Sequence, residues 1–509
     1  MDLGKTTRGA VLGRILVLFT LVLDASGDFV FPVHHKFKGQ RSLSALKAHD
    51  ARRHGRILAS AGSGSTSAVD LEIGGNGHPS DTGLYFAKLG IGSPSKDYFV
   101  QVDTGSDILW VNCIGCTNCP KKSDIGVKLT LYDPKSSSMS QPVTCDQDFC
   151  TAKYSGQLPG CRPTLLCEYD VTYGDGSATA GYFVKDNIEF DERTNGSMVF
   201  GCGDKQSGQL GKSSEALDGI LGFGQANSSV ISQLAASGKV RKQFAHCLDN
   251  VNGGGIFAIG EVVQPKVKNT TPLVPRQAHY NVAMEAVEVG GDVVQLPTDI
   301  FDTGDKEGTI IDSGTTLAYL PEEVYQPVMS KIFASQPDLK LHTVDEQFKC
   351  FQYSKSVDDG FPVVKFHFKN SASMTVYPHD YLFQLKDDVW CSGWQSSGMK
   401  SGNGDSMTLL GDLVLSNKLV IYDLENQVIG WLDYNCSSSI KVRDEKSGEI
   451  VTIGAHNLSS GFHFNNWKII DILVINKFCA AANVFFVLDL LQQAASIHFD
   501  APKFINEIV

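Results

Sequence analysis

The sequence predicts a mainly β protein built from two lobes. The 509-residue chain contains 50 glycines and 18 prolines in no periodic arrangement, which favours the many tight turns that all-β proteins need. Hydrophobic residues make up 42% of the chain and charged residues 20%, so the composition supplies a buried core and excludes a disordered chain. The length exceeds that of a typical single domain and therefore favours two lobes.

Short apolar runs rich in β-branched and aromatic residues fill the middle of the chain, and clusters of Gly, Pro, Asn and Asp separate them. Such runs are typical of strands. Helical periodicity is rare and short. The clearest predicted strands are residues 84–91, 99–102, 256–259 and 361–368, and the best helix candidates are residues 229–237 and 324–334.

Residues 1–27 have the pattern of a secretory signal peptide. Lys5, Arg8 and Arg14 precede an apolar run over residues 15–23, and small residues follow at 25–27. That run is much shorter than the roughly 20 residues that span a bilayer. We therefore expect the chain to enter the secretory pathway and to reach the extracellular space or the cell surface, with the vacuole as an alternative destination.

Residues 28–68 are interpreted as a basic pro-segment and linker. Basic side chains outnumber acidic ones in this segment, although the whole chain carries a formal net charge of −12. A basic segment of this kind could dock on the acidic body at neutral pH and leave in acid; a solvated tail explains the charge equally well. Residues 59–67, rich in Gly, Ser and Ala, fit a cleavable linker. The acidic body excludes nucleic acid as the expected partner.

Residues 437–509 form a C-terminal extension whose role the sequence does not reveal. Its apolar runs at 469–475 and 484–491 are interrupted by charged and polar residues, which makes a poor membrane-spanning helix. The polar end of the chain also departs from a glycolipid-anchor signal. Membrane association therefore stays open, and a damaged gene product is a further interpretation of this tail.

The chain contains 13 cysteines, and all but Cys479 lie between residues 113 and 436. This number favours disulfides and an oxidising compartment. The first three cysteines also have a spacing that suits a metal, but in a secreted chain disulfides are favoured. The disulfide candidates are Cys113, Cys116, Cys119, Cys145, Cys150, Cys161, Cys167, Cys202, Cys247, Cys350, Cys391 and Cys436.

Two short motifs around aspartate have the same sequence frame. Residues 103–106, Asp-Thr-Gly-Ser, and residues 312–315, Asp-Ser-Gly-Thr, each follow a buried-type strand. Two apolar residues and a glycine follow each motif farther along the chain, at residues 220–222 and 409–411. These matching pairs predict an internal repeat, with one copy in each lobe. The Asp-Thr-Gly triplets at Asp81 and Asp302 lack this frame and are interpreted as ordinary turns.

This ordered pattern resembles the pepsin-like aspartic proteases over about residues 84–436. Members of that family have two homologous β-barrel-like lobes with an active-site cleft between them, and each lobe contributes one such turn. Trp110 follows the first motif as it does in the family, and residues 173–177, Tyr-Gly-Asp-Gly-Ser, stand at the place of the flap hairpin. The cysteine-rich insertion after the first motif is similar to the plant nepenthesin-like branch.

The resemblance implies an N-terminal lobe over residues 69–270 and a C-terminal lobe over residues 271–436. It also implies that Cys350 pairs with Cys391. On the flap, Tyr173 is expected to close over the substrate, with Trp110 supporting the tyrosine ring.

The resemblance makes Asp103 and Asp312 the expected catalytic residues. Two carboxylates within hydrogen-bond distance share one proton, because both cannot ionise cheaply. One carboxylate then activates a water while its protonated partner bonds the developing oxyanion, so no metal or other cofactor is expected. Glycines allow the sharp turns, and hydroxyl side chains can hold the carboxylates. These supporting residues are Thr104, Gly105, Ser106, Ser313, Gly314 and Thr315.

We therefore expect an aspartic endopeptidase that is made as a secreted zymogen and hydrolyses internal peptide bonds at acidic pH. The expected partner is a polypeptide bound as an extended strand, and the enzyme is expected to be a monomer. The rival interpretation is a catalytically silent member of the same fold that binds a partner, as the plant xylanase-inhibitor branch does; both framed aspartates argue against it.

Glycosylation sequons in a secreted chain mark surface loops. Asn435 is a weak candidate because Cys436 occupies the middle position of its sequon. The stronger candidates are Asn195, Asn227, Asn269 and Asn457.

Overall fold

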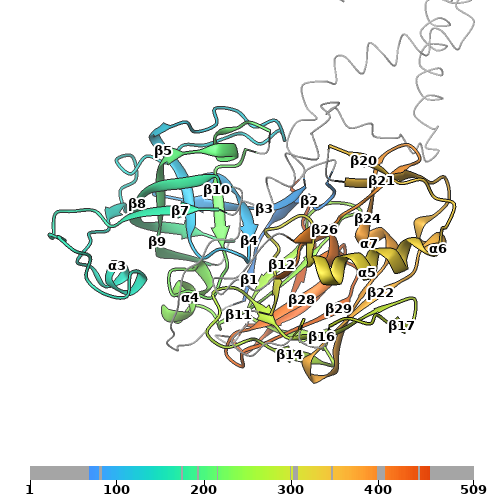
Figure 1. The fold of residues 1–509 in the computed structure, drawn as a ribbon. Helices are drawn as coiled ribbons and strands as arrows, with labels where there is room; N and C mark the ends of the chain where they lie inside the picture. The colour runs from blue at the N-terminus through green and yellow to red at the C-terminus, as the bar shows by residue number, and fades with distance from the viewer. Residues whose placement is uncertain are drawn as a thin grey trace, which may run out of the picture. The chain divides into compact units, whose positions relative to one another are not determined.

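The computed structural model describes residues 68–458, except 80–82, 174–175, 192–193, 215, 298–299, 302–307, 346–347, 398–406 and 445–446. The predicted signal peptide, the pro-segment up to residue 67, the tail after residue 458 and the turns at Asp81 and Asp302 lie outside the described residues. Most elements of the described chain are strands, so the prediction of a mainly β fold is confirmed (Figure 1).

The first half of the described chain forms a 9-stranded sheet. Strand β10 (Gly219–Gly222) lies in it between β4 (Lys96–Asp103), to which it runs parallel, and β5 (Leu109–Thr117), to which it runs antiparallel. The other strands are β2 (Ile73–Asn76), β3 (Leu84–Ile91), β6 (Gln141–Pro142), β7 (Glu168–Thr172), β8 (Ala178–Glu189) and β9 (Asn195–Gln206).

The second half repeats this strand arrangement in a 5-stranded sheet. Strand β27 (Thr408–Leu410) runs parallel to β18 (Thr309–Ile311) and antiparallel to β19 (Ala318–Pro321). The outer strands are β15 (Asn281–Val282) and β26 (Trp394–Ser397). Each half therefore has a short buried strand running between the two strands that flank its aspartate motif.

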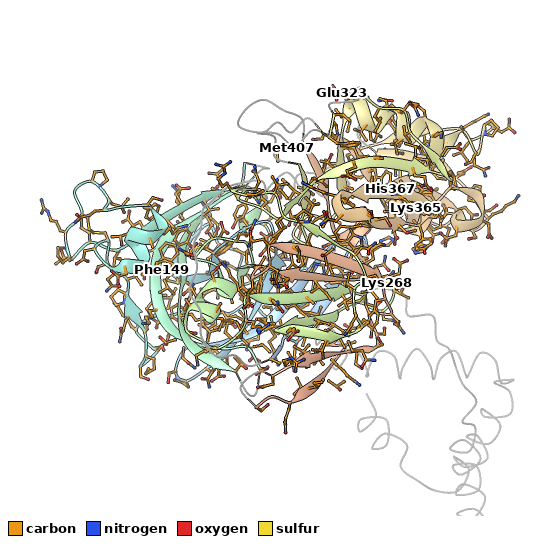
Figure 2. All side chains as sticks on the ribbon, turned by 90° about the horizontal axis from the view of Figure 1, so that it is seen from below. Phe149, Lys268, Glu323, Lys365, His367 and Met407 are labelled. Carbon is orange, nitrogen blue, oxygen red and sulfur yellow. A yellow bond between two sulfur atoms is a disulfide. The ribbon has the colours of Figure 1, made fainter. Side chains whose placement is uncertain are left out.

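Two 4-stranded sheets complete the second half. In one of them, Lys365 and His367 on β22 both contact Glu288 on the neighbouring strand β16, and Figure 2 labels both side chains. The strands of these sheets are β16 (Met284–Val289), β17 (Asp292–Val293), β20 (His342–Val344), β21 (Phe348–Gln352), β22 (Val364–Phe368), β23 (Ala372–Val376), β24 (Leu382–Lys386) and β25 (Val389–Ser392).

A 6-stranded sheet joins strands from both halves. Phe223, Phe244, Phe257 and Tyr422 form an aromatic cluster on it, with centroids of adjacent rings 4.3–5.9 Å apart. In order, its strands are β1 (Val69–Asp70), β12 (Gly255–Ile259), β11 (Gln243–Leu248), β28 (Lys418–Asp423), β29 (Val428–Asp433) and β14 (Thr270–Pro272) (Figure 1).

The first part of the predicted C-terminal extension belongs to the folded body. Strands β30 (Ser439–Arg443) and β31 (Ile450–Gly454) pair with each other, and β30 pairs with β13 (Glu261–Gln264). Beyond them, His456 Nε2 lies 2.8 Å from Asp70 Oδ1, and the Leu458 N–H donates to the carbonyl of Ile73. These contacts hold residues 70–73, at the start of the described chain, against residues 456–458.

All the predicted elements are present in the structure, although most of their ends differ by one to three residues. Strand β3 has the expected bounds, and α4 (Val230–Ala236) and α5 (Glu322–Phe333) occupy the two expected helical regions. The run 361–368 becomes a strand only from Val364. Pro362 stands in its first part, and proline has no N–H to donate to a ladder. The remaining α-helices of the described chain are short: α3 (Asp148–Lys153), α6 (Val357–Gly360), α7 (Pro378–Tyr381) and α8 (Asp412–Leu415).

All the predicted disulfide candidates are paired, and the pairing of Cys350 with Cys391 is confirmed. Two disulfides anchor the insertion that carries α3, where Phe149 also packs edge-on against Phe183 (Figure 2). The described chain has no helix that is both long and apolar enough to cross a bilayer. The disulfides are Cys113–Cys202, Cys116–Cys119, Cys145–Cys161, Cys150–Cys167, Cys247–Cys436 and Cys350–Cys391.

Candidate active site

Asp103 and Asp312 occupy equivalent positions in the two repeats. Asp103 ends β4 and its carbonyl accepts a hydrogen bond of 2.8 Å from the N–H of Phe223, directly after β10. Asp312 directly follows β18, and its N–H donates to the carbonyl of Leu410 at the end of β27, at 3.0 Å. The side chains of both aspartates are almost completely buried. Each motif is thus fixed to the short strand that the sequence repeat predicted as its partner.

The two carboxylates accept matching sets of hydrogen bonds. Asp103 Oδ1 accepts from the Gly105 N–H at 2.9 Å, and Asp103 Oδ2 accepts from the Ser106 hydroxyl at 2.5 Å. Asp312 has the same arrangement. Its Oδ1 accepts from the Gly314 N–H and its Oδ2 from the Thr315 hydroxyl, both at 2.7 Å. Donors on both oxygens hold each carboxylate in one orientation.

The two motifs are in direct contact although they lie 209 residues apart in the sequence. The Ser313 N–H donates to Thr104 Oγ1 at 2.9 Å. A Cβ atom placed on Gly105 would lie 2.6 Å from the carboxyl atoms of Asp312. The first motif therefore packs against the second carboxyl so closely that only glycine fits at its third position.

A glycine also stands where each motif turn meets its partner strand. A Cβ on Gly222 would lie 2.4 Å from the backbone of Asp107, and a Cβ on Gly411 would lie 2.3 Å from the carbonyls of Thr315 and Leu317. These approaches explain why glycine follows the two apolar residues in both halves.

Tyr173 and Trp110 are also brought together. Strands β7 and β8 form a hairpin, and at its tip the Tyr173 N–H donates to the carbonyl of Ser177 at 2.8 Å. The indole N–H of Trp110, on β5, donates to the Tyr173 hydroxyl at 2.8 Å. Both rings are buried in one apolar cluster. The tryptophan thus fixes the tyrosine side chain from the strand that follows the first motif.

Asp107 is a further buried carboxyl beside the first motif, and the sequence motifs do not mark it as a site residue. Its Oδ1 accepts from the Ala226 N–H at 2.9 Å. Burial raises the pKa of Asp107 to about 7, with a smaller contribution from the charge of Asp103, against the opposing effects of the Ala226 hydrogen bond, Lys153 and Lys242. The sequence feature that could have identified Asp107 is its place in the turn, directly before the apolar run that contains Trp110.

Lys153 is a buried cation that our sequence analysis also missed. It lies at the end of α3, and 8% of its surface is exposed. Its Nζ is 5.7 Å from the ring centroids of Tyr154 and Phe183, and among the described residues this nitrogen has no hydrogen-bond partner. Burial lowers the pKa of Lys153 to about 8. The local sequence does not predict this burial, because it depends on two disulfides that hold the helix in place.

Most of the predicted glycosylation sites lie on exposed positions. Asn195, Asn269 and Asn457 are exposed, whereas Asn227 is half-buried. Asn435 is also exposed, but Cys436 in the middle of its sequon is part of a disulfide.

Comparisons with known proteins match almost the whole described chain. Two family models match: "Xylanase inhibitor N-terminal" over residues 85–261 and "Xylanase inhibitor C-terminal" over residues 279–432. Aspartic proteinase 36 of Arabidopsis thaliana is 53% identical over 456 residues, which cover 88% of this chain and 92% of that protein. Aspartic proteinase 39 of the same plant is 50% identical, with coverage of 88% and 93%.

A solved structure shares the fold at lower identity. The crystal structure of basic 7S globulin from soybean superposes with a TM-score of 0.56 and covers 72% of this chain and 96% of that chain. The two sequences are 21% identical, so this comparison concerns the fold alone.

Proposed function

Because this chain belongs to the pepsin-like aspartic proteinase family of plants, we propose that it hydrolyses internal peptide bonds with Asp103 and Asp312 as the catalytic pair. The observation that carries the proposal is the contact between the two motifs. Both carboxylates have matching donors, and Gly105 packs against the carboxyl of Asp312.

The proposed mechanism needs one proton shared by the pair. Two carboxylates held this close cannot both ionise cheaply, so at acidic pH one is protonated and the other is not. The ionised carboxylate takes a proton from a water, the water oxygen attacks the peptide carbonyl, and the protonated carboxyl donates a hydrogen bond to the oxyanion. The proton is then passed to the leaving nitrogen as the C–N bond breaks. The fixed donors keep both carboxylates aligned throughout.

We propose that the substrate binds as an extended strand beneath the hairpin of β7 and β8. An extended peptide offers backbone groups for pairing and places side chains alternately on its two sides. Tyr173 at the hairpin tip would cover the reacting bond and exclude water, and the hydrogen bond from Trp110 would keep the tyrosine ring oriented.

We further propose that the enzyme is secreted as a zymogen and acts in an acidic compartment. The disulfides of the described chain support an oxidising route, since such bonds persist outside the cytosol. The basic segment 28–68 would dock on the acidic body and be released when acid protonates carboxylates.

The test is cleavage of a denatured protein by the secreted, acid-treated chain at about pH 3 to 6. Wild type should cleave it and be inhibited by the transition-state mimic pepstatin. Asp103→Asn and Asp312→Asn should each lose activity by roughly 10³-fold or more, because either change removes the acid–base partnership. Ser437→Ala, far along the chain from both motifs, is a control that should stay active. Retained cleavage in either aspartate variant would refute the mechanism.

A second candidate function is partner binding without turnover, because the two matching family models are those of xylanase inhibitors. The same experiment separates the two functions. A folded, processed wild type that binds a xylanase but cleaves no protein would support the binding function and exclude the protease.

A further inference from the structure

A chain of hydrogen bonds runs from the contact between the two motifs to a buried histidine. Thr104 Oγ1, which accepts from the Ser313 N–H, also hydrogen-bonds the hydroxyl of Tyr422. That hydroxyl lies 3.0 Å from Nε2 of His246. All four residues are buried almost completely. The first motif is thus linked to β11 and β28 of the six-stranded sheet.

The direction of these hydrogen bonds follows from the state of His246. Burial lowers the pKa of His246 to about 3, so the ring is neutral above about pH 3. Its Nδ1 is buried without a hydrogen-bond partner among the described residues. An unpaired lone pair is tolerated better than an unpaired N–H, which places the proton on Nε2. Nε2–H then donates to Tyr422, and the Tyr422 hydroxyl donates to Thr104.

The rings around Tyr422 hold its hydroxyl in place. Its ring stacks on Phe244 with centroids 4.3 Å apart, and Tyr280 packs against it edge-on at 4.7 Å. The second motif has no equivalent support, because Ser313 Oγ is buried without a hydrogen-bond partner within the described chain. The contact between the motifs therefore depends on the side chain of Thr104 and on what fixes it.

We propose that Tyr422 and His246 are positioning residues that fix Thr104 and thereby set the separation of the Asp103 and Asp312 carboxyl groups. The inference rests on the proposed function, since its consequence is kinetic. The coupling between two carboxyl groups falls as they move apart. Loss of the Tyr422 hydroxyl should thus loosen the pair and bring its two apparent pKa values closer together.

The test compares Tyr422→Phe with wild type in kcat, KM and the pH profile of kcat/KM. We expect kcat to fall roughly 10-fold, because small misplacements of reacting groups are costly, while KM stays within about twofold. The acidic and basic limbs of the profile should move toward each other. Asp107, Asp412 and Tyr280, the other titratable groups that face these residues, are unchanged in the variant. His246→Leu should have a similar effect, and His246→Gln, which keeps an N–H donor, should restore part of kcat.

The matched control is Tyr381→Phe. Tyr381 is also a buried tyrosine, and its hydroxyl donates at 2.7 Å to the carbonyl of Pro362, away from the motifs. Tyr381→Phe should lower the melting temperature without changing the spacing between the acidic and basic limbs of the pH profile. A Tyr422→Phe enzyme that matches Tyr381→Phe in kcat and limb spacing would overturn the inference.

A measurement independent of activity separates this inference from the proposed function. The melting-temperature shifts of Tyr422→Phe and Thr104→Val should not add in the double variant, because both remove the same hydrogen bond. Additive shifts would overturn the inference. An inactive wild type with non-additive shifts would count against the proposed function and would leave the hydrogen-bond chain supported.

Discussion

The turn around Asp103 and the turn around Asp312 hold their carboxylates alike but stand in different surroundings. Both carboxylates accept one backbone N–H and one hydroxyl. Near Asp103 lies a second buried carboxyl, Asp107, and the charges of Lys153 and Lys242 act on its pKa. The Asp312 turn has its buried carboxyl at a different place in the repeat: Asp412 follows β27, and its N–H donates to the carbonyl of Thr315.

This difference separates two tasks. The repeated backbone places two equivalent acids, and the side chains that the repeat does not share give the two turns different electrostatic surroundings. Two identical carboxylates take different roles only when their environments differ. The asymmetry of the site therefore lies in residues outside the motifs, and four sets of variants test this comparison.

The largest effect is expected from Gly105→Ala. The new Cβ would lie 2.6 Å from the Asp312 carboxyl, closer than atoms can pack, so that carboxyl must move. Activity should fall roughly 10²-fold or more, measured as kcat/KM on a peptide substrate. Gly454→Ala is the control, because nothing lies within 4 Å of its new Cβ. A Gly105→Ala enzyme as active as Gly454→Ala would show that the close contact is unimportant.

Asp107→Asn should change how stability depends on pH. The pKa of Asp107 is about 7 in the folded state, above its ordinary value of 3.8. The folded state therefore holds a proton that the unfolded chain releases, so this stabilisation is complete below about pH 4 and is lost as pH rises toward 7. Its size is on the order of 4 kcal/mol.

Thermal melts at about pH 4 and pH 7 test this prediction, and the asparagine variant should lose less stability between them. Asp218 serves as the comparison, since burial raises its pKa to about 7 as well and it contacts neither motif aspartate. Asp218→Asn should flatten the stability curve without altering the pH profile of kcat. Identical pH curves for Asp107→Asn and wild type would contradict the assignment.

Lys153→Met should stabilise the protein. The folded-state pKa of Lys153 is about 8 against an ordinary 10.5, so burial of the charged amine costs stability at every pH below 8. Removing the charge should recover roughly 1–2 kcal/mol, measured by chemical unfolding near pH 6. Lys418→Met provides the contrast. Lys418 is buried too, but its Nζ pairs with Asp380 at 2.9 Å, and its loss should destabilise. If both changes destabilise the protein, the unpaired ammonium of Lys153 does not lower its stability.

The smallest effect is expected from Trp110→Phe. The change removes the N–H that donates to Tyr173. We expect kcat/KM to fall roughly fivefold, which corresponds to a loss of about 1 kcal/mol in transition-state stabilisation. Trp394, in the second half, serves as the comparison: it is fully buried, and its indole nitrogen has no hydrogen-bond partner among the described residues. Trp394→Phe should lower the melting temperature and leave kcat/KM unchanged. Equal kinetic losses in both variants would argue for packing alone.

Local sequence was sufficient to predict the repeated parts of the site. The frame around Asp103 and Asp312 predicted two turns that the structure brings into contact. The strand bounds of β3 and the pairing of Cys350 with Cys391 were also predicted correctly. Strand runs, turn glycines and family motifs could be predicted because each is recognisable from a few neighbouring residues.

The asymmetric parts could not be predicted because their partners are distant in sequence. His246 and Tyr422 are 176 residues apart, and each stands in a strand whose apolar pattern gives no reason to single it out. The boundary of β22 was missed because the apolar run continues through Pro362, which cannot join the ladder. Burial of Lys153 depends on cross-links that fold its helix onto distant strands.

The contacts that hold residues 69–73 in place bear on how uniform the N-terminus of the mature enzyme would be. From Val69 onward the backbone is paired in β1, His456 holds the Asp70 side chain, and Leu458 holds the carbonyl of Ile73. Exopeptidases need a free, extended end, and backbone tied into a sheet denies it to them. Trimming of the linker should therefore stop just before Val69. Ragged first cuts would then converge on one N-terminus, which mass spectrometry of the purified enzyme would detect as a single dominant species.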